Sequence, residues 1–387
     1  MTHTMPRRDR PRRFLGIVAA GVATVTCGSV AVADSTAPST VRDGKIGYVL
    51  TDLYWAIYQT ADAKTECPQG FNDGPREQYA VLFPAGSRKR TLVDTQLKLE
   101  TETWLPTAQP DSFVFKEVVG PNSYGLNLDG KVGPHDFTSV DGTKGIDNQL
   151  YRALGCIIGF RGPDGVEFIF ENKAIAQAAY NRTMIEVSDV NDLTNDADVT
   201  VTIYRGLDRL LTDATGNKIV AGGSQRIDTR WGKKLIQQTK GKIVDGVLTT
   251  EPAQQMLIPW MNLGVPTFQL IRDMRLQLKL SPTGAQGLIA GYADVDTWYK
   301  QLIRNDSTHH LSNGQISGIS LYKALRRLAD AYPDAKTGAN TAISSALDAK
   351  FTQVYIQHPQ GEAAKAELVR SLAKPAAVKT AANDAKH

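Results

Sequence analysis

The segment "MRLQLKLSPTG", Met274–Gly284, alternates apolar and polar residues before it ends in a turn that contains Pro and Gly. In an extended chain its Met and Leu residues fall on one face, and Arg275, Gln277 and Lys279 fall on the other. This two-residue period is typical of a half-buried strand rather than of a helix. The segment therefore predicts one strand of an antiparallel sheet with one face in the core.

Segments of the same kind occupy much of the chain before it. They are short, rich in Val, Ile and Thr, and separated by Gly, Pro, Asn and Asp. Such spacing favours an antiparallel sheet that buries its apolar face in a two-layer or sandwich arrangement. We therefore expect a mainly β domain over 34–292, with an α+β fold as the alternative. The strand segments are 165–171, 183–190, 197–206, 217–223 and 245–252.

The period changes toward the C-terminus. Apolar residues recur three and four positions apart in 294–304 and in 318–332, which is the pattern of an amphipathic helix. The segment 341–356 fits a third helix that ends in a short strand. Together these segments predict a small helical subdomain over 293–358. The remainder, 359–387, is rich in Ala and Lys and predicts a disordered tail.

The N-terminus has the order of a secretory signal peptide. Five arginines among residues 7–13 precede an apolar run, and that run closes on Ala-Val-Ala at Ala33. The segment fits both Sec and twin-arginine export. We expect residues 1–33 to be removed, no membrane span in the mature chain, and a periplasmic or secreted location.

The positive charge of the chain belongs largely to this export segment. The chain has 44 basic and 40 acidic residues, and removal of residues 1–33 leaves 39 of each. A formally neutral mature protein lacks the electrostatic basis for binding nucleic acid or an anionic membrane. We therefore expect no nucleic-acid partner.

Two cysteines remain in the mature chain, Cys67 and Cys156, and neither belongs to a CxxC pair. In an oxidising compartment they predict one disulfide that closes a loop of about 90 residues. Two separate buried thiols are the alternative.

Carboxylates and amides crowd the glycine-rich stretch 124–148. Oxygen ligands without clustered His or Cys suit a hard cation, calcium before magnesium, and glycines let a short loop wrap around an ion. The spacing differs from that of an EF-hand. The alternative is a surface loop in which Asp-Gly pairs make turns and Asp147 caps the helix that follows. Both interpretations apply to the candidate ligands Asn127, Asp129, Asp136, Asp141, Asp147 and Asn148.

The sequences "GLNLDG" and "GIDNQLYRALG", followed by "TMIEVSDVNDLTNDADVTVTIYRGLD", resemble uncharacterised exported proteins and lipoproteins of proteobacteria, including myxobacteria. Those proteins carry an Asp-rich LDxDG...DNxLG stretch and then a DVxDLxNDxxVxV strand. The resemblance covers roughly 124–208 and implies export and a β-rich architecture. In this chain 131–145 separates the two halves of the acidic motif. The matching positions are Asn127, Asp129, Gly130, Asp147, Asn148 and Leu150, and then Asp189, Asp192, Asn195 and Asp196.

The last four of these positions form a second acidic patch. The patch either completes the first site across the sheet or forms a site of its own. The alternative, which we favour, is a solvated connection between two strands.

No complete catalytic signature accompanies these features, because HExxH, GxSxG, Walker and GxGxxG patterns are all absent from the sequence. Aromatic residues around Trp55 and Trp298 fit either core packing or a stacking platform for sugar rings. We expect an exported, soluble binding or accessory protein with a structural calcium ion, whose partner is a small ligand, a glycan or an envelope protein. A secreted, metal-assisted hydrolase or lyase is the alternative.

Overall fold

The computed structural model describes only part of the chain. The predicted signal peptide (1–33), the strand at 165–171 and nearly all of the predicted tail lie outside the described residues. For 96–98, 104–106, 258–262, 265–268, 301–305 and 318–319 only the backbone is described. The described ranges are 40–72, 96–98, 104–106, 115–162, 172, 175–176, 182–216, 218–229, 236–262, 265–305 and 318–360.

The alternating segment at Met274–Leu280 lies in a long strand, as predicted. This strand, β12, turns back at Ser281 and Gly284 into an antiparallel hairpin with β13. Across the hairpin Leu276 lies opposite Ile289, and both side chains are buried in the main core. The principal strands are β1 (Ile46–Trp55), β6 (Arg182–Ser188), β7 (Asp196–Gly206), β9 (Gln237–Val244), β10 (Val247–Thr250), β12 (Val265–Ser281), β13 (Gly284–Asp294) and β15 (Asn340–Gln357).

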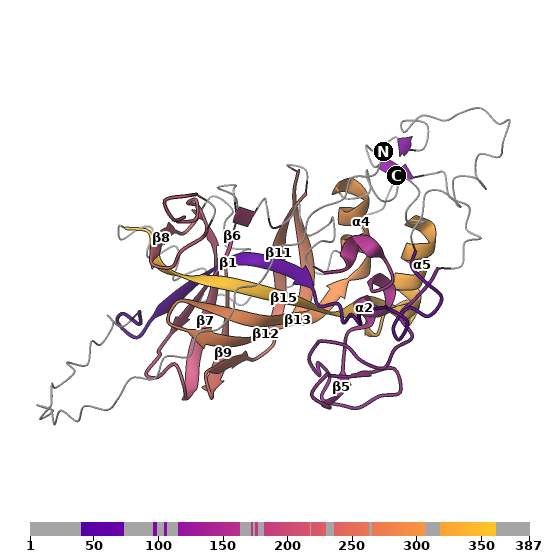
Figure 1. Cartoon of the computed structure of the whole chain (residues 1–387), viewed down its shortest axis with the longest axis horizontal. Helices are drawn as coiled ribbons and strands as arrows, with labels where there is room; N and C mark the ends of the chain where they lie inside the picture. The colour runs from indigo at the N-terminus through magenta and orange to yellow at the C-terminus, as the bar shows by residue number, and fades with distance from the viewer. Residues whose placement is uncertain are drawn as a thin grey trace, which may run out of the picture. The chain divides into compact units, whose positions relative to one another are not determined.

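These strands form one sheet that closes on itself. Their order is β1-β6-β7-β9-β10-β12-β13-β15, and β1 also pairs with β15. In the closing pair, Gly47 lies opposite Val354 and Trp55 lies opposite Leu347. Every neighbouring pair in this ring is antiparallel. The mainly β, antiparallel prediction is confirmed, and the two expected layers are opposite sides of a single closed sheet (Figure 1).

Apolar side chains fill the interior of the closed sheet. Each strand of the ring contributes to one continuous core, because alternate residues point inward. Burial of this much apolar surface is the main force that holds the sheet closed. The inward residues include Tyr48, Ile185, Ile203, Ile243, Leu248, Leu278, Ile289 and Leu347, one from each strand.

Smaller elements cover the outer face and the ends. β11 (Ala253–Asn262) pairs with β12, β14 (Ala331–Pro333) pairs with β15, and β8 (Gly223–Arg226) runs parallel to β15. A second cluster around Val49, Met184 and Tyr204 packs on the outer face beneath 207–229. Two further hairpins are β2 (Gln96–Lys98) with β3 (Trp104–Pro106), and β4 (Phe137–Thr138) with β5 (Lys144–Ile146).

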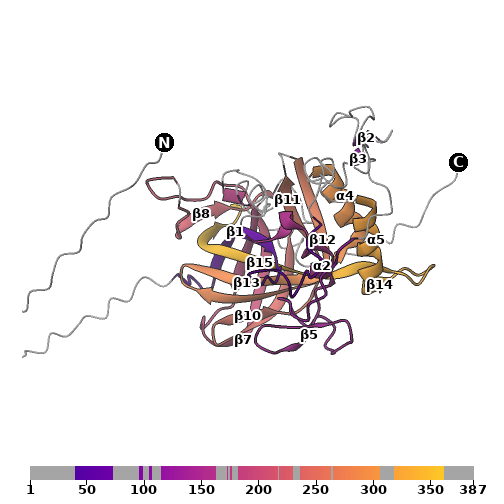
Figure 2. The same cartoon turned by 45° about the vertical axis from the view of Figure 1, so that its right-hand side comes forward.

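The helices α2 (Gln149–Leu154), α4 (Val295–Asn305) and α5 (Gly318–Leu328) gather at the end of the sheet opposite β8 (Figures 1 and 2). A short 3-10 turn, η2 (Ile158–Phe160), follows α2. Asp294 begins α4 by accepting a hydrogen bond from the Thr297 amide at 2.9 Å. The two C-terminal helices occur as predicted. No helix in the described part of the chain is long and apolar enough to cross a membrane.

The prediction of a third helix at 341–356 is wrong. This segment is β15, which pairs with β1 and β13 and so completes the closed sheet. Its apolar residues Ile343, Leu347 and Phe351 lie four apart and fit a helical template, but they point inward from a strand. The described residues of 293–358 therefore form two helices followed by sheet strands rather than a helical subdomain.

Candidate functional site

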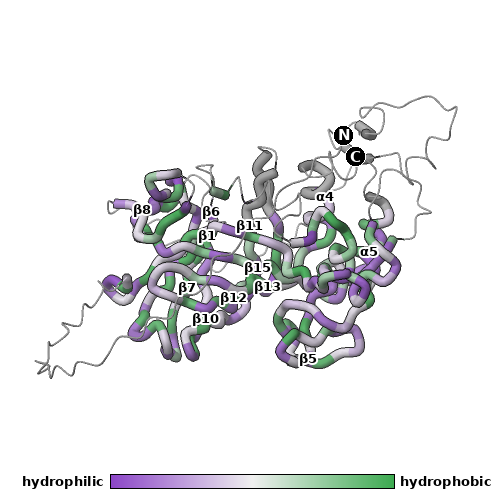
Figure 3. The backbone as a smooth tube through the Cα atoms, in the orientation of Figure 1, coloured by the Kyte–Doolittle hydropathy of each residue, from purple (hydrophilic) through white to green (hydrophobic). Residues whose placement is uncertain are grey.

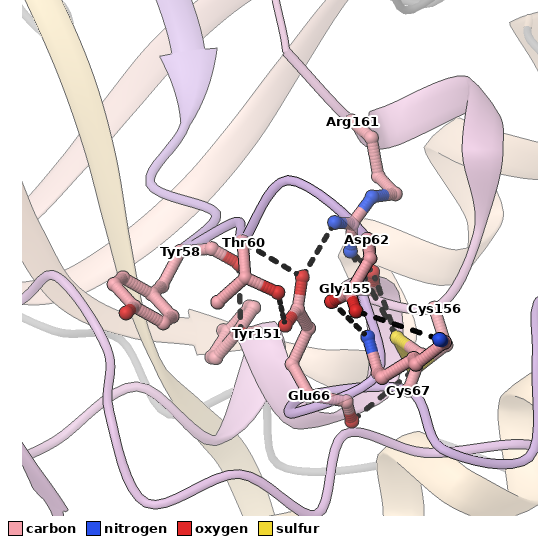
Figure 4. A network of polar contacts seen from close by, with 10 residues as sticks. Tyr58, Thr60, Asp62, Glu66, Cys67, Tyr151, Gly155, Cys156 and Arg161 are labelled. Atoms are coloured by element: carbon pink, nitrogen blue, oxygen red, sulfur yellow. Dashed lines mark hydrogen bonds and ion pairs between the residues drawn. A yellow bond between two sulfur atoms is a disulfide. The ribbon is translucent and has the colours of Figure 1, made fainter.

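Cys67 and Cys156 form a disulfide, as the sequence predicts. The bond joins the segment after β1 to the residues that follow α2, at the helical end of the closed sheet. Beside it the buried Glu66 carboxylate accepts hydrogen bonds from Arg161 at 2.7 Å and from the Thr60 amide and hydroxyl at 2.9 and 2.7 Å (Figure 4). Burial alone raises the pKa of Glu66, but the Arg161 and Thr60 hydrogen bonds outweigh it and the pKa is lowered. We interpret this buried network as structural, because the charged groups of Glu66 and Arg161 already have hydrogen-bond partners within it.

The acidic loop, 124–148, lies on the outer face of β13 and β15. Its Leu126 and Leu128 pack with Tyr292 from β13 in a third apolar cluster. Arg275 from β12 donates to the carbonyl oxygens of Asn127 at 3.1 Å and Leu128 at 2.7 Å, which ties the loop to the sheet. Hydrophilic residues recur along the loop around β5 (Figure 3).

Most acidic side chains of this loop hold local turns. Asp129 accepts from the Lys131 amide at 2.8 Å, and Asn127 accepts from the Gly130 amide at 2.6 Å. Asp136 accepts from the Gly133 amide, and Asp141 accepts from the Ser139 hydroxyl and the Thr143 amide. These bonds are typical of Asx turns, in which a side chain stabilises the backbone next to it.

Asp147 is the exception, because it is buried and bonds across the loop. Its carboxylate accepts from the Leu128 amide at 2.6 Å and from the Asp129 amide at 3.3 Å. Burial raises the pKa of Asp147 to about 6; the two amides oppose this rise, while Asp136 and Asp129 add to it. The expectation that Asp147 caps the next helix is wrong by one residue, since Asn148 is the N-cap of α2.

Asn148 joins three parts of the fold. Its side-chain oxygen accepts from the Tyr151 amide at 3.3 Å, which caps α2. Its side-chain nitrogen donates to Tyr124 O at 2.8 Å, to Ala56 O at 3.1 Å and to Ser123 Oγ at 3.2 Å. A single buried amide therefore fixes the end of β1 against the start of the acidic loop.

The described residues contain no group of three or more His, Cys, Asp or Glu side chains arranged to hold a metal ion. Of the predicted ligands, Asp129 and Asp136 are each close enough to Asp147 to raise its pKa electrostatically. Asp141 bonds within the β4–β5 turn, where the Ser139 hydroxyl and the Thr143 amide hold its pKa at about 2. A calcium ion in this loop stays a prediction, and the acidic side chains already have partners in the turns.

The second acidic patch forms the turn between β6 and β7. Asp189 accepts from the Thr200 hydroxyl at 2.8 Å, Asp192 from the Thr194 amide at 2.8 Å, and Asp196 from the Asn191 amide at 2.7 Å. Asn195 accepts from the Asp245 amide at 3.1 Å in the β9–β10 turn. Among the described residues these bonds join the patch to strand ends and not to the acidic loop.

A pocket of about 390 Å³ opens where the end of β1 meets the acidic loop and the outer face of β15. We call it the outer-face pocket. Tyr54 of β1 lies directly opposite Asp348 of β15, and Lys350 lies two residues further along the same face. Ala56 and Tyr124, whose carbonyl oxygens both accept hydrogen bonds from Asn148, also line the pocket. Its walls include Tyr54, Ala56, Gln59, Tyr124, Asp348 and Lys350.

The pocket combines aromatic surface with unlike charges. Tyr124 is 44% exposed, and its ring meets that of Tyr58 edge-on at 5.8 Å between centroids. The Asp348 carboxylate accepts a hydrogen bond from the adjacent Ala349 amide and interacts electrostatically with Lys350, and within the described residues neither side chain forms an ion pair. Asp348 is an exposed residue, yet partial burial of its carboxyl raises its pKa; Lys350 and the Ala349 amide oppose this rise, and Asp52 adds to it.

Comparison with protein-family models, with curated proteins and with solved structures finds no match for the chain. The site is therefore interpreted from its own chemistry.

Sequence reasoning missed the charged half of this pocket because it assigned 341–356 to a helix. As a strand, "LDAKF" places Leu347, Ala349 and Phe351 inward, and Asp348 and Lys350 outward together. Of the predicted aromatic platform, Trp55 and Trp298 pack edge-on in the core at 6.1 Å between centroids. Trp55 also lines the pocket, together with its neighbour Tyr54 and with Tyr124 of the acidic loop.

Proposed function

We propose that the protein is an exported, non-enzymatic binding protein that holds a small polar ligand in the outer-face pocket. The observation that carries this proposal is an aromatic pocket in which a carboxylate, Asp348, and an ammonium, Lys350, lie on the same face of β15. Its volume of about 390 Å³ falls within the range of small-molecule sites, about 300–1,000 Å³. A few convergent polar groups on an apolar wall are the usual composition of such sites.

Two features support the exported location. The N-terminal segment has the order of a signal peptide, and a disulfide such as Cys67–Cys156 persists in oxidising compartments. A structural calcium ion in the acidic loop belongs to the same proposal. In that role the ion would hold the loop that forms one wall of the pocket, so it would act on architecture rather than on chemistry.

The proposal is tested by ligand-dependent thermal unfolding of the mature protein. A panel of neutral sugars, zwitterionic amino acids, amines and phosphate is screened, and a ligand that binds the folded state raises Tm. The rise is expected to disappear in Tyr124→Ala and Asp348→Ala and to persist in Lys336→Gln, an exposed lysine in the β14–β15 turn. A rise that survives both pocket variants, or no rise with any compound, contradicts the proposal.

A secreted hydrolase is the second candidate, and one observation favours it. Asp348 has a raised pKa in a pocket, and Asp52 is close enough to contribute to that shift. Two neighbouring carboxyl groups of unequal pKa are the arrangement of a general acid and its partner. Hydrolysis of a chromogenic glycoside that Asp348→Asn abolishes while ligand binding persists would favour the enzyme over the binding protein.

A further inference from the structure

The geometry of the outer-face pocket narrows the class of its ligand. We infer that the pocket binds one uncharged pyranose ring, stacked on tyrosine and hydrogen-bonded to Asp348, Lys350 and Gln59. This inference rests on the proposed function, because it names the ligand of the same pocket.

The polar groups of the pocket have complementary hydrogen-bonding roles. A carboxylate only accepts, an ammonium only donates, and an amide such as Gln59 does both. A hydroxyl group also does both, so a polyol satisfies Asp348 and Lys350 without carrying a charge. An anion would be repelled by Asp348, and a cation would be repelled by Lys350.

The placement of the two charged residues suits a ring that carries several hydroxyls. Asp348 and Lys350 are two residues apart on one face of β15, which places their Cα atoms roughly 6.6 Å apart. The flexible Lys350 side chain can bring its ammonium to a ligand that Asp348 holds, so two hydroxyls of one ring can contact both groups. A titration with leucine distinguishes this ligand from an α-amino acid.

The aromatic surface suits the C–H face of a sugar. Tyr124 presents an exposed ring, and Tyr54 lies opposite Asp348 in the β1–β15 register. Tyrosine combines an apolar face with a polar tip, so it can pack against ring C–H groups while its hydroxyl stays in water. Leu288 and Ala56 add apolar surface beside these rings.

The test measures dissociation constants by titration calorimetry on the mature protein. The probes are the methyl glycosides of glucose, galactose, mannose and N-acetylglucosamine, with leucine as the zwitterion, phosphate as the anion and myo-inositol as a ring that lacks the pyranose oxygen. At least one methyl glycoside is expected to bind. Tyr124→Ala should raise its Kd roughly 3- to 10-fold, and Tyr124→Phe should leave it within about twofold.

The charged residues give a second set of variants. Asp348→Ala should raise Kd roughly 10- to 100-fold, because charge-assisted hydrogen bonds are lost, while Lys336→Gln should leave it unchanged. If leucine or phosphate binds with this variant dependence and no glycoside does, the pyranose inference is overturned and the proposed binding function stands. If no probe binds in a way that depends on Tyr124 or Asp348, both fail.

Discussion

The side-chain nitrogen of Asn148 lies 2.8 Å from the carbonyl oxygen of Tyr124, so the N-cap of α2 also positions a wall of the outer-face pocket. Asn148→Ala removes the cap and the bonds to Tyr124 and Ala56 together. We expect a loss of about 1–3 kcal/mol in the free energy of unfolding, larger than the loss of a cap alone. Denaturant unfolding measures it.

Asn148→Asp separates the two roles, because aspartate caps a helix equally well but has no donor for the Tyr124 and Ala56 carbonyl oxygens. If Asn148→Asp is as stable as wild type and binds ligand normally, the cap is the whole contribution of Asn148.

Asp147 predicts an unusual pH dependence. Its folded-state pKa, raised to about 6, exceeds the ordinary value, so the folded protein binds this proton more tightly than the unfolded chain. The stabilisation is therefore complete at low pH and is lost as pH rises through about 6. Relative to wild type, Asp147→Asn should gain on the order of 2 kcal/mol in unfolding free energy between pH 4 and pH 8, measured in chelator.

Asp141 in the same loop is the matched control with the opposite sign. Hydrogen bonds from the Ser139 hydroxyl and the Thr143 amide lower its pKa to about 2, so its contribution is present above the ordinary carboxyl pKa and is lost in acid. Asp141→Asn should therefore lose stability relative to wild type as pH rises from 3 to 5. A parallel pH response of both variants would refute the assignment for Asp147.

A calcium ion in the acidic loop would reverse the Asp147 prediction. Calcium binds the ionised carboxylates, so it should raise Tm at neutral pH and favour the charged form of Asp147. Asp129→Asn and Asp147→Asn should each reduce this rise, while Asp192→Asn in the second acidic patch should not. Equal Tm values in chelator and in calcium would leave the loop held by its turns and by Arg275 alone.

The fold was predictable where the local pattern was clear. The alternation at Met274–Leu280 predicted β12, and the helical period predicted α4 and α5. The closure of the sheet was not predictable. β1 and β15 come from opposite ends of the described chain, and the apolar pattern of a strand does not indicate which other strand it pairs with. The disulfide was predictable because only two cysteines follow the predicted signal peptide.

β15 was mistaken for a helix because its central residues are buried on both faces. Ala342 and Ala346 pack under the acidic loop while Ile343 and Leu347 pack inward, so the alternation of polar and apolar residues disappears. That assignment separated Asp348 from Lys350 in the predicted geometry and hid the pocket. Asp129 and Asp147 were predicted from the sequence as metal ligands, and that stays a prediction; in the structure both accept hydrogen bonds from backbone amides.

The buried pair of Glu66 and Arg161 gives the largest expected effect of a single substitution. Their side chains are 0% and 10% exposed, so loss of Arg161 leaves the Glu66 charge buried with only the Thr60 hydrogen bonds and no opposite charge. Arg161→Met is expected to cost about 3–5 kcal/mol in unfolding free energy. Lys240→Met is the control, because it breaks the exposed pair with Asp198 and should cost less than about 1 kcal/mol.

The pH profile distinguishes loss of this ion pair from simple loss of packing. In wild type the lowered pKa of Glu66 means that the stabilisation is present above the ordinary glutamate pKa and lost as pH falls below it. Without Arg161, burial should instead raise the pKa of Glu66, so the variant should lose stability as pH rises from about 4 to 7. The double variant Glu66→Leu with Arg161→Met should recover much of the loss and show neither dependence. If the single and double variants are equally unstable at every pH, the contribution is packing around Phe71 and the disulfide rather than charge.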